Sequence, residues 1–404
     1  MKKVLIFSTH PIQYHAPIWR GLNELDGFDV RVIYGTDMSV RGYRDPEFCV
    51  DVKWDQPLLE GTRGAVLSVE SEMSFFKPRA PLRAIRDALG NFRPDVVMIT
   101  AYSKLFWVDV LRWVFSEQIP LVIRSEASDV AGLRSPFKSW LRDRILGFLY
   151  RRTAAFAVIG SEARKHYNRL NVSEKLQFSS PYCVDSELFE RQFEQLRDSR
   201  DQFRADMHIE PDGMVLIFSG KLVERKDPMI ILSAIARLEV SVLAKIHLVV
   251  AGDGPLRAEF VHVAENLLGH RFHYLGFMNQ MEISKAYIIA DLLVLPSRPG
   301  WHETWGLVVN EAMQFGCCAI VSQSVGCHSD LIDSDTGTVF TSGDVEELAA
   351  QVTRFVGLPL VERARMAQAA RSKISAYTAA RAVDGVRRAV HCAARKPHSR
   401  DLGN

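Results

Sequence analysis

Short runs of apolar residues, many of them β-branched, alternate with longer stretches of helical periodicity along most of the chain. Twelve of these runs are predicted to be strands, six in each half. They are Val4–Ser8, Val30–Tyr34, Val96–Thr100, Leu121–Arg124, Ala155–Ile159 and Leu176–Ser179, then Val215–Ser219, Ile246–Ala251, Phe272–Leu275, Leu292–Leu295, Cys318–Val321 and Gly337–Phe340. Because the runs are continuously apolar and are joined by helical segments of roughly ten or more residues, they predict parallel sheets covered on both faces. Two sets of six strands predict two doubly wound α/β domains.

The strand pattern stops between residues 187 and 212, where the sequence is charged and ends in the turn Pro211-Asp212-Gly213. We interpret this stretch as a helical linker. The expected boundaries are a first domain over residues 1–186, the linker over 187–212, and a second domain over 213–377. Residues 378–404 are expected to form a last helix and a frayed tail.

The composition is typical of a globular protein of two or three domains. The chain has 404 residues, 47% of them apolar and 24% charged, with a formal net charge of +2, so nothing global indicates nucleic-acid binding. The six cysteines contain no Cys-x-x-Cys pair and join no histidine cluster, which favours reduced thiols without a zinc site. Leu105–Phe115 is apolar but carries Asp109 and Arg112, so it predicts a buried helix and not a membrane span. We therefore expect a cytoplasmic protein.

Two carboxylates, Glu303 and Glu311, flank the start of a predicted helix that follows the strand Leu292–Leu295. Backbone N–H groups at such a helix start have no partner inside the helix and can bind an anion. Together the two acids could hold sugar hydroxyls on either side of a phosphate, as a nucleotide sugar requires. The alternative is an acid favoured by the helix dipole and a solvated helix residue. Glu311 lies among apolar residues, where a carboxylate needs a partner, and this favours a functional role.

The second domain opens with a strand that ends at Gly220, followed by Lys221 and Lys226 in one strand-to-helix loop. This loop lies at the carboxyl edge of the predicted sheet, where α/β sheets bind ligands. Two ammonium groups at that edge suit a diphosphate; the alternative is a solvated charged loop. In the first domain, His10 follows the first strand at the equivalent edge, where it could contact a substrate or be structural.

The segment Arg134–Arg152 mixes basic, aromatic and aliphatic residues and carries a single acid. One interpretation is a basic amphipathic helix that makes peripheral contact with an anionic membrane. The other is a helix whose apolar stripe packs on the first sheet, with its arginines in water. A combination of the two is our working interpretation.

Five motifs along the chain carry a resemblance to a known family. They are Ile159-Gly160-Ser161 with Pro181–Asp185, Ser219–Leu222 with Lys226, Gly252–Pro255, Leu275–Phe277, and Glu303–Glu311 followed by Gly316 and Val325-Gly326. In this order they resemble glycosyltransferase family 4, whose members are retaining enzymes of the GT-B fold. The resemblance extends over essentially the whole chain and is most specific in the second domain. The opening His10-Pro11-Ile12-Gln13-Tyr14 is similar to a subgroup of bacterial surface-polysaccharide enzymes.

The resemblance implies a role for each candidate residue. The diphosphate of a nucleotide sugar would be bound by Gly220, Lys221 and Lys226, and the transferred sugar would be contacted by Glu303. Phosphate and sugar would also be contacted by Thr304 and by the backbone N–H groups of Trp305, Gly306 and Leu307. The base would pack on Phe277 and Met278, and the ribose would be held by Glu311. From the first domain, His10 and Glu126 complete the candidate catalytic set. Four departures stand out. Lys221 replaces the usual arginine and Asp227 replaces a common glycine. Glu126 replaces a common histidine, and Tyr182-Cys183 replaces Asn-Gly.

The fold implied by the resemblance is GT-B, two Rossmann-like domains facing a cleft, with the last helix, about residues 379–394, crossing back onto the first domain. The activity implied is that of a retaining hexosyltransferase without metal or cofactor. The acceptor would be a saccharide or a lipid-linked saccharide in polysaccharide or lipopolysaccharide assembly, at the inner face of the cytoplasmic membrane. Two alternatives stay open. A nucleotide-sugar epimerase would use His10 and Glu126 as acid and base. A non-catalytic nucleotide-sugar-binding protein would be expected to lack Lys226 or Glu311, and both are present.

Overall fold

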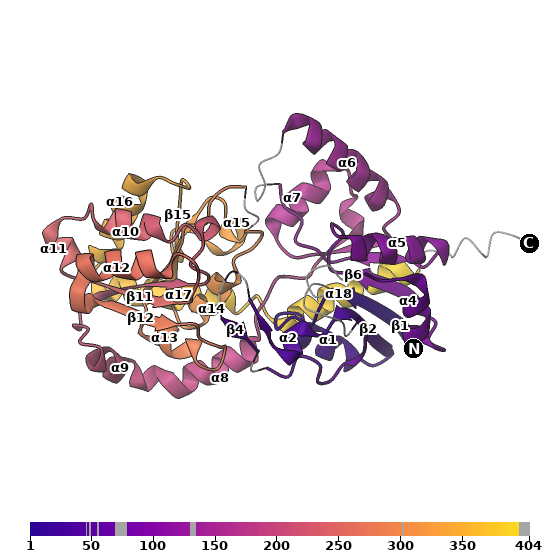
Figure 1. Cartoon of the computed structure of the whole chain (residues 1–404), viewed down its shortest axis with the longest axis horizontal. Helices are drawn as coiled ribbons and strands as arrows, with labels where there is room; N and C mark the ends of the chain where they lie inside the picture. Colours follow the sequence, from indigo (N-terminus) through magenta and orange to yellow (C-terminus); the bar gives the residue numbers. More distant parts are fainter. Residues whose placement is uncertain are drawn as a thin grey trace, which may run out of the picture.

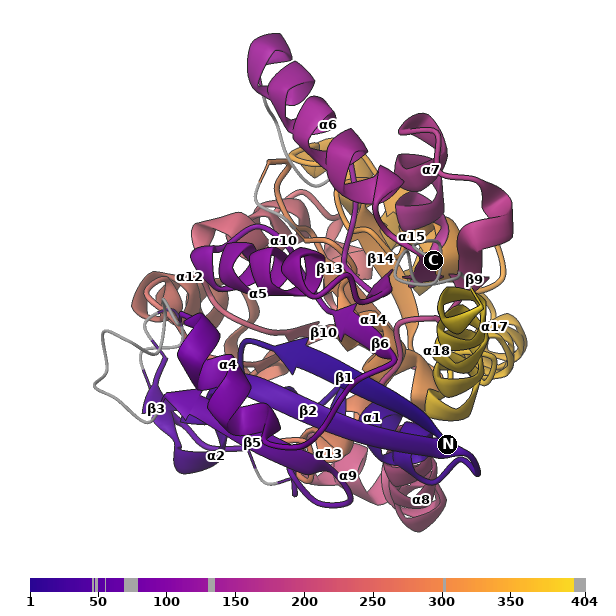
Figure 2. The same cartoon turned by 90° about the vertical axis from the view of Figure 1, so that its right-hand side faces the viewer.

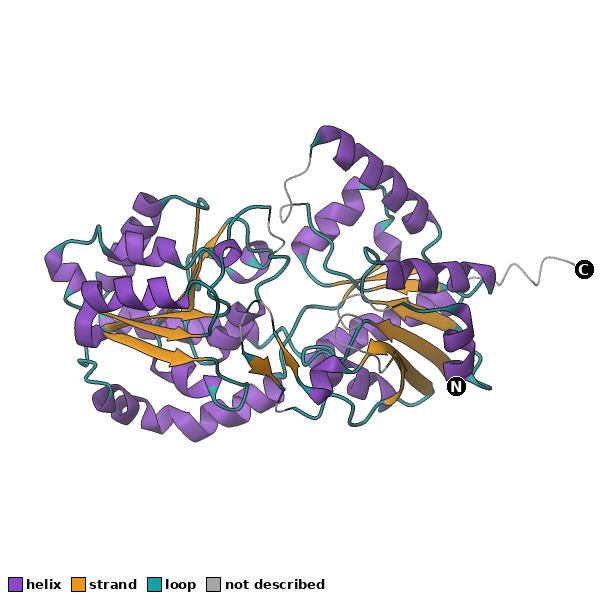
Figure 3. Cartoon of the chain, viewed as in Figure 1, coloured by secondary structure: helices purple, strands orange, loops and turns teal. Residues whose placement is uncertain are grey.

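The protein consists of two lobes, each built on a parallel sheet with helices on both faces (Figure 1). The computed structural model describes residues 1–45, 47, 50–54, 56–68, 79–129, 135–300 and 303–395. The predicted frayed tail and Arg134, the first residue of the predicted basic segment, lie outside these described residues. Figure 3 shows the strands of both lobes enclosed by helices, which confirms the predicted fold class.

The first lobe contains a seven-stranded sheet in the order β5-β2-β1-β6-β7-β8-β9. Its strands are β1 (Lys2–Ser8), β2 (Phe28–Thr36), β5 (Arg63–Ser68), β6 (Val96–Ile99), β7 (Leu121–Ile123), β8 (Ala155–Val158) and β9 (Gln177–Ser179). All six predicted strands are present, but the count of six was wrong because β5 was missed. Strand β5 has only a short apolar centre and lies at the sheet edge, where it is partly exposed, so it lacks the continuous apolar run of a strand buried on both faces.

Helices and one short hairpin complete the first lobe. They are α1 (Ala16–Asn23), α2 (Met38–Arg41), the hairpin β3 (Tyr43–Arg44) and β4 (Asp51–Val52), α4 (Leu82–Leu89), α5 (Leu105–Ser116), α6 (Pro136–Arg151) and α7 (Ser161–Arg169). Helix α5 is the predicted buried helix. Within the described part of the chain, no helix is long and apolar enough to cross a membrane.

The second lobe contains a six-stranded sheet in the order β12-β11-β10-β13-β14-β15, which matches the six predicted strands. Its strands are β10 (Met214–Ser219), β11 (Ile246–Ala251), β12 (Phe272–Gly276), β13 (Leu292–Leu295), β14 (Cys318–Ser322) and β15 (Gly337–Phe340). Its helices are α10 (Met229–Ile235), α11 (Val240–Leu243), α12 (Arg257–Leu268), α13 (Ile283–Ile289), α14 (Leu307–Gln314), α15 (His328–Leu331), α16 (Val345–Val356) and α17 (Leu360–Ile374). Because all its strands are parallel, every loop that follows a strand lies at the same edge.

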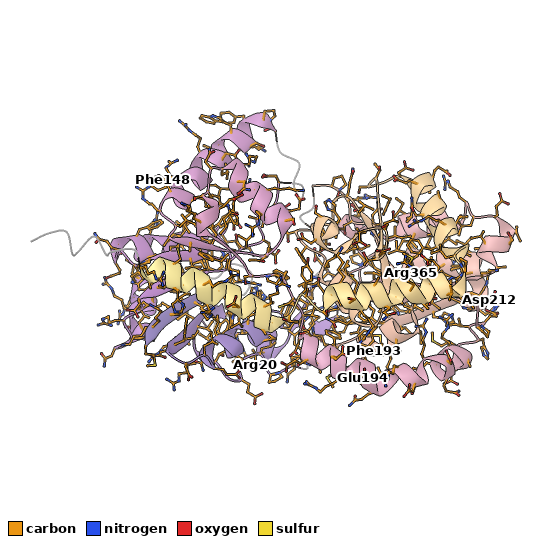
Figure 4. The ribbon with its side chains drawn as sticks, turned by 180° about the vertical axis from the view of Figure 1, so that it is seen from behind. Arg20, Phe148, Phe193, Glu194, Asp212 and Arg365 are labelled. Atoms are coloured by element: carbon orange, nitrogen blue, oxygen red, sulfur yellow. The ribbon has the colours of Figure 1, made fainter. Side chains whose placement is uncertain are left out.

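The charged linker is held against the second lobe. It forms two helices, α8 (Ser186–Leu196) and α9 (Arg200–Asp206), separated by a single short turn. The buried Arg204 donates hydrogen bonds to the carbonyls of Ile289 and Gly213 and pairs with Asp291 at 3.2 Å. Figure 4 shows Phe193 and Glu194 on α8, along the lower margin of this lobe. The charges of the linker thus anchor it to the start of the second sheet.

The last helix, α18 (Ala379–Ala394), packs on the sheet of the first lobe, while α17 packs on the second (Figures 2 and 4). Ser180 at the end of β9 donates a hydrogen bond to the carbonyl of Ala382 at 2.9 Å. Gly385 lies so close to the first sheet that a Cβ added there would be 1.9 Å from the carbonyl oxygen of Ser179. The contact between α18 and the first lobe therefore requires a glycine.

We predict that Gly385→Ala lowers the free energy of unfolding by about 1–3 kcal/mol, because the methyl group forces α18 away from the sheet. Gly147→Ala provides the matched control, since Gly147 also lies inside a helix but a Cβ there would make only an ordinary contact, 3.5 Å from the Arg151 side chain. That change should stabilise the protein by up to about 1 kcal/mol through helix propensity. Chemical denaturation of both variants measures the difference, and equal effects of the two changes would show that the close packing of α18 is not needed.

Candidate active site

Glu311 on α14 is buried, and both of its carboxylate oxygens accept hydrogen bonds from tyrosines. Tyr287 of α13 donates to Oε2 at 2.8 Å, and Tyr14 of the other lobe donates to Oε1 at 3.0 Å. Burial raises the pKa of Glu311, and the hydrogen bonds from Tyr287 and Tyr14 oppose that shift. With 5% of its surface exposed, Glu311 is not the solvated helix residue of the alternative interpretation.

A cavity between the lobes adjoins Glu311 and is lined by residues from both lobes. It brings together the predicted residues Gly220, Phe277, Met278 and Glu311, and adds Gln13, Tyr14, Trp54 and Gln280. Its volume of about 100 Å³ is well below the roughly 300 Å³ at which typical ligand sites begin. Side chains such as Tyr14 must therefore move before a ligand of nucleotide size can enter.

Glu303 and Lys226 form an ion pair in the loops that follow β13 and β10. Ser297 donates a further hydrogen bond to Glu303 Oε2 at 3.1 Å. The loop that holds Glu303 runs so close to the next one that a Cβ on Gly326 would lie 1.9 Å from the carbonyl oxygen of Thr304. The glycine at position 326 is thus what allows the loop to carry Glu303 to Lys226.

Lys221 and its neighbour Arg225 are neutralised by acids of the first lobe. Lys221 Nζ lies 2.9 Å from Asp45 and 2.8 Å from Glu47, next to the hairpin β3–β4. Arg225 also binds Glu47, with its Nη2 at 2.9 Å. The hydrogen bonds from Arg225 and then Lys221 lower the pKa of Glu47 to about 2. The ammonium group of Lys221, which is predicted to bind a diphosphate, is therefore paired with carboxylates in this structure.

The start of α14 has the properties expected of an anion site. Gly306 caps the helix with a φ of +95°, a backbone conformation that favours glycine. Among the described residues, none accepts a hydrogen bond from the backbone N–H groups of Thr304, Trp305 or Gly306. The Trp305 side chain is buried and donates from Nε1 to Asn310 at 2.7 Å, so it supports the loop from below. Such N–H groups can bind phosphate or sugar oxygens.

Glu126 reaches this loop from the first lobe. Its carboxylate accepts hydrogen bonds from Tyr182 at 2.5 Å and from the hydroxyl of Thr304, the residue after Glu303. Tyr182, one of the departures from the family pattern, lies on Trp305 with ring centroids 6.0 Å apart. Glu126 of the first lobe therefore lies beside the loop that carries Glu303 of the second lobe.

His10 lies at the carboxyl end of β1, where its Nδ1 is 3.1 Å from the hydroxyl of Thr9. Burial and the charge of Lys104 lower the pKa of His10 to about 4. The imidazole is therefore neutral near pH 7, and it can donate one hydrogen bond and accept another. Within the described residues, no hydrogen bond joins His10 to Glu126 or Glu303.

Several residues of the site were missed in the sequence. They are Tyr287, Ser219, Asp45, Glu47 and Arg225, together with the contacts of Tyr14 and Tyr182. Tyr14, Tyr182 and Ser219 did belong to motifs named above, but nothing local indicates their partners. Asp45 and Glu47 lie between the two short strands β3 and β4, in a stretch without periodic pattern, so only the packing of the lobes brings them to Lys221.

Comparison with known proteins connects both lobes to glycosyltransferases. A family model described as "Glycosyl transferase 4-like domain" matches residues 12–178, and one described as "Glycosyl transferases group 1" matches residues 199–373. The chain is 28% identical over 270 residues to a Campylobacter jejuni enzyme named GalNAc-α-(1→4)-GalNAc-α-(1→3)-diNAcBac-PP-undecaprenol α-1,4-N-acetyl-D-galactosaminyltransferase, covering 67% of each chain. Among the curated relatives, the aligned segments span from 32% to 71% of the relative's own length.

Solved structures share the fold at low sequence identity. The Anabaena protein HepE in complex with UDP and glucose has a TM-score of 0.67 and 16% identity, with 97% of this chain and 100% of that chain covered. A UDP-GlcNAc 2-epimerase from Neisseria meningitidis, bound to UDP-GlcNAc, has a TM-score of 0.60 and 14% identity, with 97% and 100% covered. The fold by itself therefore does not separate a transferase from an epimerase.

The neutralisation of Lys221 leads to a prediction about anion affinity. Asp45→Asn combined with Glu47→Gln should tighten the binding of UDP or GDP by roughly five- to tenfold, because a diphosphate no longer has to displace two carboxylates from Lys221. Isothermal titration calorimetry measures the change. Asp87→Asn with Glu117→Gln is the matched control, since these acids pair with Arg83 and Arg86 of α4. Weaker binding in the first variant would mean that the acids hold Lys221 in place for the ligand.

Proposed function

This chain belongs to the glycosyl transferases group 1 family and has the GT-B fold, and we propose that it moves a sugar from a nucleoside-diphosphate sugar to an acceptor hydroxyl with retention of anomeric configuration. The observation that carries this proposal is the convergence of Lys221, Lys226, Glu303 and Glu311 around the start of α14, at one edge of the second sheet. Each group then has a distinct part in binding the sugar donor.

The diphosphate is the leaving group, and its negative charge grows as the bond to the sugar breaks. Lys226 and Lys221 supply two positive charges. The N–H groups of Thr304, Trp305 and Gly306, which bind no acceptor among the described residues, supply hydrogen bonds without reorganisation. When the diphosphate binds, it replaces the carboxylates that now neutralise Lys221. This arrangement supports a leaving group stabilised by the protein's own cations, with no metal required.

The two glutamates bind different parts of the sugar donor in this proposal. Glu311 lies beside Phe277 and Met278, which suits a carboxylate that holds the ribose while these residues pack on the base. Glu303 lies next to Lys226, which suits contact with the hydroxyls of the transferred sugar beside the diphosphate. Both glutamates are then committed to binding, which argues against a two-carboxylate glycosidase route.

In this proposal the first lobe binds the acceptor. Glu126 is the candidate for contact with the acceptor or the transferred sugar, because its carboxylate already reaches Thr304 beside Glu303. The Campylobacter relative is named for transfer to an undecaprenol-linked saccharide, and this supports a lipid-linked saccharide as the acceptor in cell-surface polysaccharide assembly. The deciding experiment is a screen of UDP- and GDP-sugars with such acceptors for product formation.

The roles of the lysine and the glutamates can be separated by nucleotide binding. Lys226→Ala should weaken UDP or GDP binding by about 1.5–3 kcal/mol, roughly ten- to hundredfold in Kd, through loss of a charge-assisted contact. Glu311→Gln should weaken both nucleotide and nucleotide-sugar binding, whereas Glu303→Gln should spare the free nucleotide and lower turnover. Lys245→Ala, a surface lysine paired with Asp212, is the control. Unchanged affinity in Lys226→Ala, or the reverse pattern for the glutamates, would contradict these roles.

The stereochemistry of the product tests the reaction itself. A retaining transferase gives a product with the anomeric configuration of the sugar donor, and the coupling of the anomeric proton in an NMR spectrum reports it. An epimerase would instead convert the nucleotide sugar without any acceptor. Inversion at the anomeric carbon, or acceptor-independent epimerisation, would overturn the proposed reaction.

A further inference from the structure

Helix α6 stands out from the first lobe. In two perpendicular views its N-terminal half lies clear of the other elements, and only its C-terminal half rests on the body (Figures 1 and 2). The residues of α6 that are buried are Leu146, Leu149 and Tyr150. Tyr150 is fixed there by hydrogen bonds to Tyr102 and His166, each at 3.0 Å. One face of the helix therefore anchors it, and the rest is available to solvent.

A second apolar face of α6 points away from the protein. Its members recur at the three- and four-residue spacing of a helix face, and they are Phe137 (70% exposed), Trp140 (55%), Leu141 (45%), Ile145 (60%) and Phe148 (49%). We call these five residues the outer stripe. Phe137 and Trp140 stack on each other with ring centroids 6.1 Å apart, and Figure 4 shows Phe148 on the outer side of α6. Contiguous apolar surface of this kind marks an interaction site.

Positive charges line the outer stripe. The guanidinium group of Arg144 lies 5.5 Å from the ring of Trp140, and that of Arg152 lies 3.6 Å from the ring of Phe148. Lys138 is exposed one helical turn before Leu141. In the part of the chain that the structure describes, no carboxylate pairs with Lys138, Arg144 or Arg152. The outer face of α6 thus combines apolar side chains with charge of a single sign.

Arg142 differs from these residues and has a structural role. It pairs with Asp129 at 3.3 Å and with Asp143 at 3.7 Å, on the side of α6 that faces α7. Arg169 of α7 binds the same two acids. The charge of Arg142 is therefore already matched, and it is not part of the outer face.

We infer that the outer stripe of α6 docks on the surface of an anionic lipid bilayer. A convex, projecting helix fits a flat surface, and aromatic and aliphatic side chains can enter the boundary between headgroups and acyl chains while Lys138, Arg144 and Arg152 contact lipid phosphates. The stripe is also a poor match to an acidic protein groove, because its five exposed members are all apolar and the guanidinium groups of Arg144 and Arg152 lie over two of its aromatic rings. The bilayer is bound peripherally through this one helix.

This inference deepens the proposed function but is tested without it. Docking through α6 would hold the first lobe at the bilayer, where a lipid-linked acceptor resides, and that consequence rests on the proposed glycosyl transfer. Binding of the protein to vesicles, measured without sugar donor or acceptor, depends only on α6. A failure of vesicle binding and a failure of sugar transfer are therefore separate results.

The experiment is sedimentation of the full chain with sucrose-loaded vesicles of phosphatidylcholine, with and without phosphatidylglycerol. The wild type should pellet with the anionic vesicles at low salt and be released as the salt concentration rises. Lys138→Gln, Arg144→Gln and Arg152→Gln combined should lower the partition coefficient on the order of hundredfold, since each basic residue near an anionic surface contributes about fivefold. Trp140→Ser, Ile145→Ser and Phe148→Ser combined should also lower it more than tenfold.

The matched control removes the same charges from the other lobe. Lys245→Gln, Arg237→Gln and Arg365→Gln combined neutralise one lysine and two arginines that pair with acids of the second lobe, and this variant should bind as the wild type does (Figure 4 shows Arg365). Every substitution in these three variants is at a surface position, and circular dichroism checks that each variant is folded.

Three outcomes would overturn the inference. The wild type could stay in the supernatant with anionic vesicles at low salt, or the two α6 variants could bind as well as the wild type. The third is a wild-type dimer by light scattering that becomes a monomer in the Ser variant without any vesicle binding, which would make α6 an interface between protein chains. Quenching of Trp140 by brominated lipids, lost in Trp140→Phe, would instead support insertion of the outer stripe.

Discussion

A carboxylate that is removed from water needs hydrogen bonds, and Glu311 obtains them from both lobes. Tyr287 comes from the same lobe, whereas Tyr14 comes from the loop that follows the first strand of the other lobe. The bond from Tyr14 therefore joins the two lobes beside the cavity between them. In the proposed function, the hydroxyls of a ribose would replace the tyrosine hydroxyls that now bind Glu311. The carboxylate of Glu311 would then serve both the contact between the lobes and the recognition of the sugar donor.

The positive charges of the cleft are also neutralised by groups from both lobes. Three cations, Lys221, Arg225 and Lys226, are gathered at the edge of the second sheet, where their mutual repulsion would be costly without anions nearby. Asp45 and Glu47 from the first lobe and Glu303 from the second supply those anions. In the proposed function, a diphosphate would replace these carboxylates as the partner of the cations. Because Asp45 and Glu47 belong to the first lobe, binding of the sugar donor would then break an ion-pair contact between the two lobes.

Close approach of backbone segments keeps this arrangement rigid where the chemistry requires it. Gly326 lets one loop pass directly over Thr304, and Gly385 lets the last helix lie directly on the end of the first sheet. The first of these contacts fixes the loop of Glu303, and the second ties the carboxyl-terminal end of the chain to the lobe of Glu126. Helix α6 is built in the opposite way. Only one of its faces is fixed, and the other remains open for a partner outside the chain.

The sequence by itself determined the strands and the loops that carry the second-lobe site. Twelve strands were visible because strands buried on both faces are continuously apolar, and parallel order then forces Lys221, Lys226 and Glu303 to one edge. The apolar surroundings of Glu311 also indicated its burial. Only the tertiary structure decided that Tyr14, 297 residues away, would be a partner of Glu311, and that Asp45 and Glu47 would neutralise Lys221. A local pattern records whether a residue faces water or core, whereas the meeting of remote groups depends on how two lobes pack. The same limit applies to α6, whose apolar residues look alike in the sequence although one set is buried and the other lies in solvent.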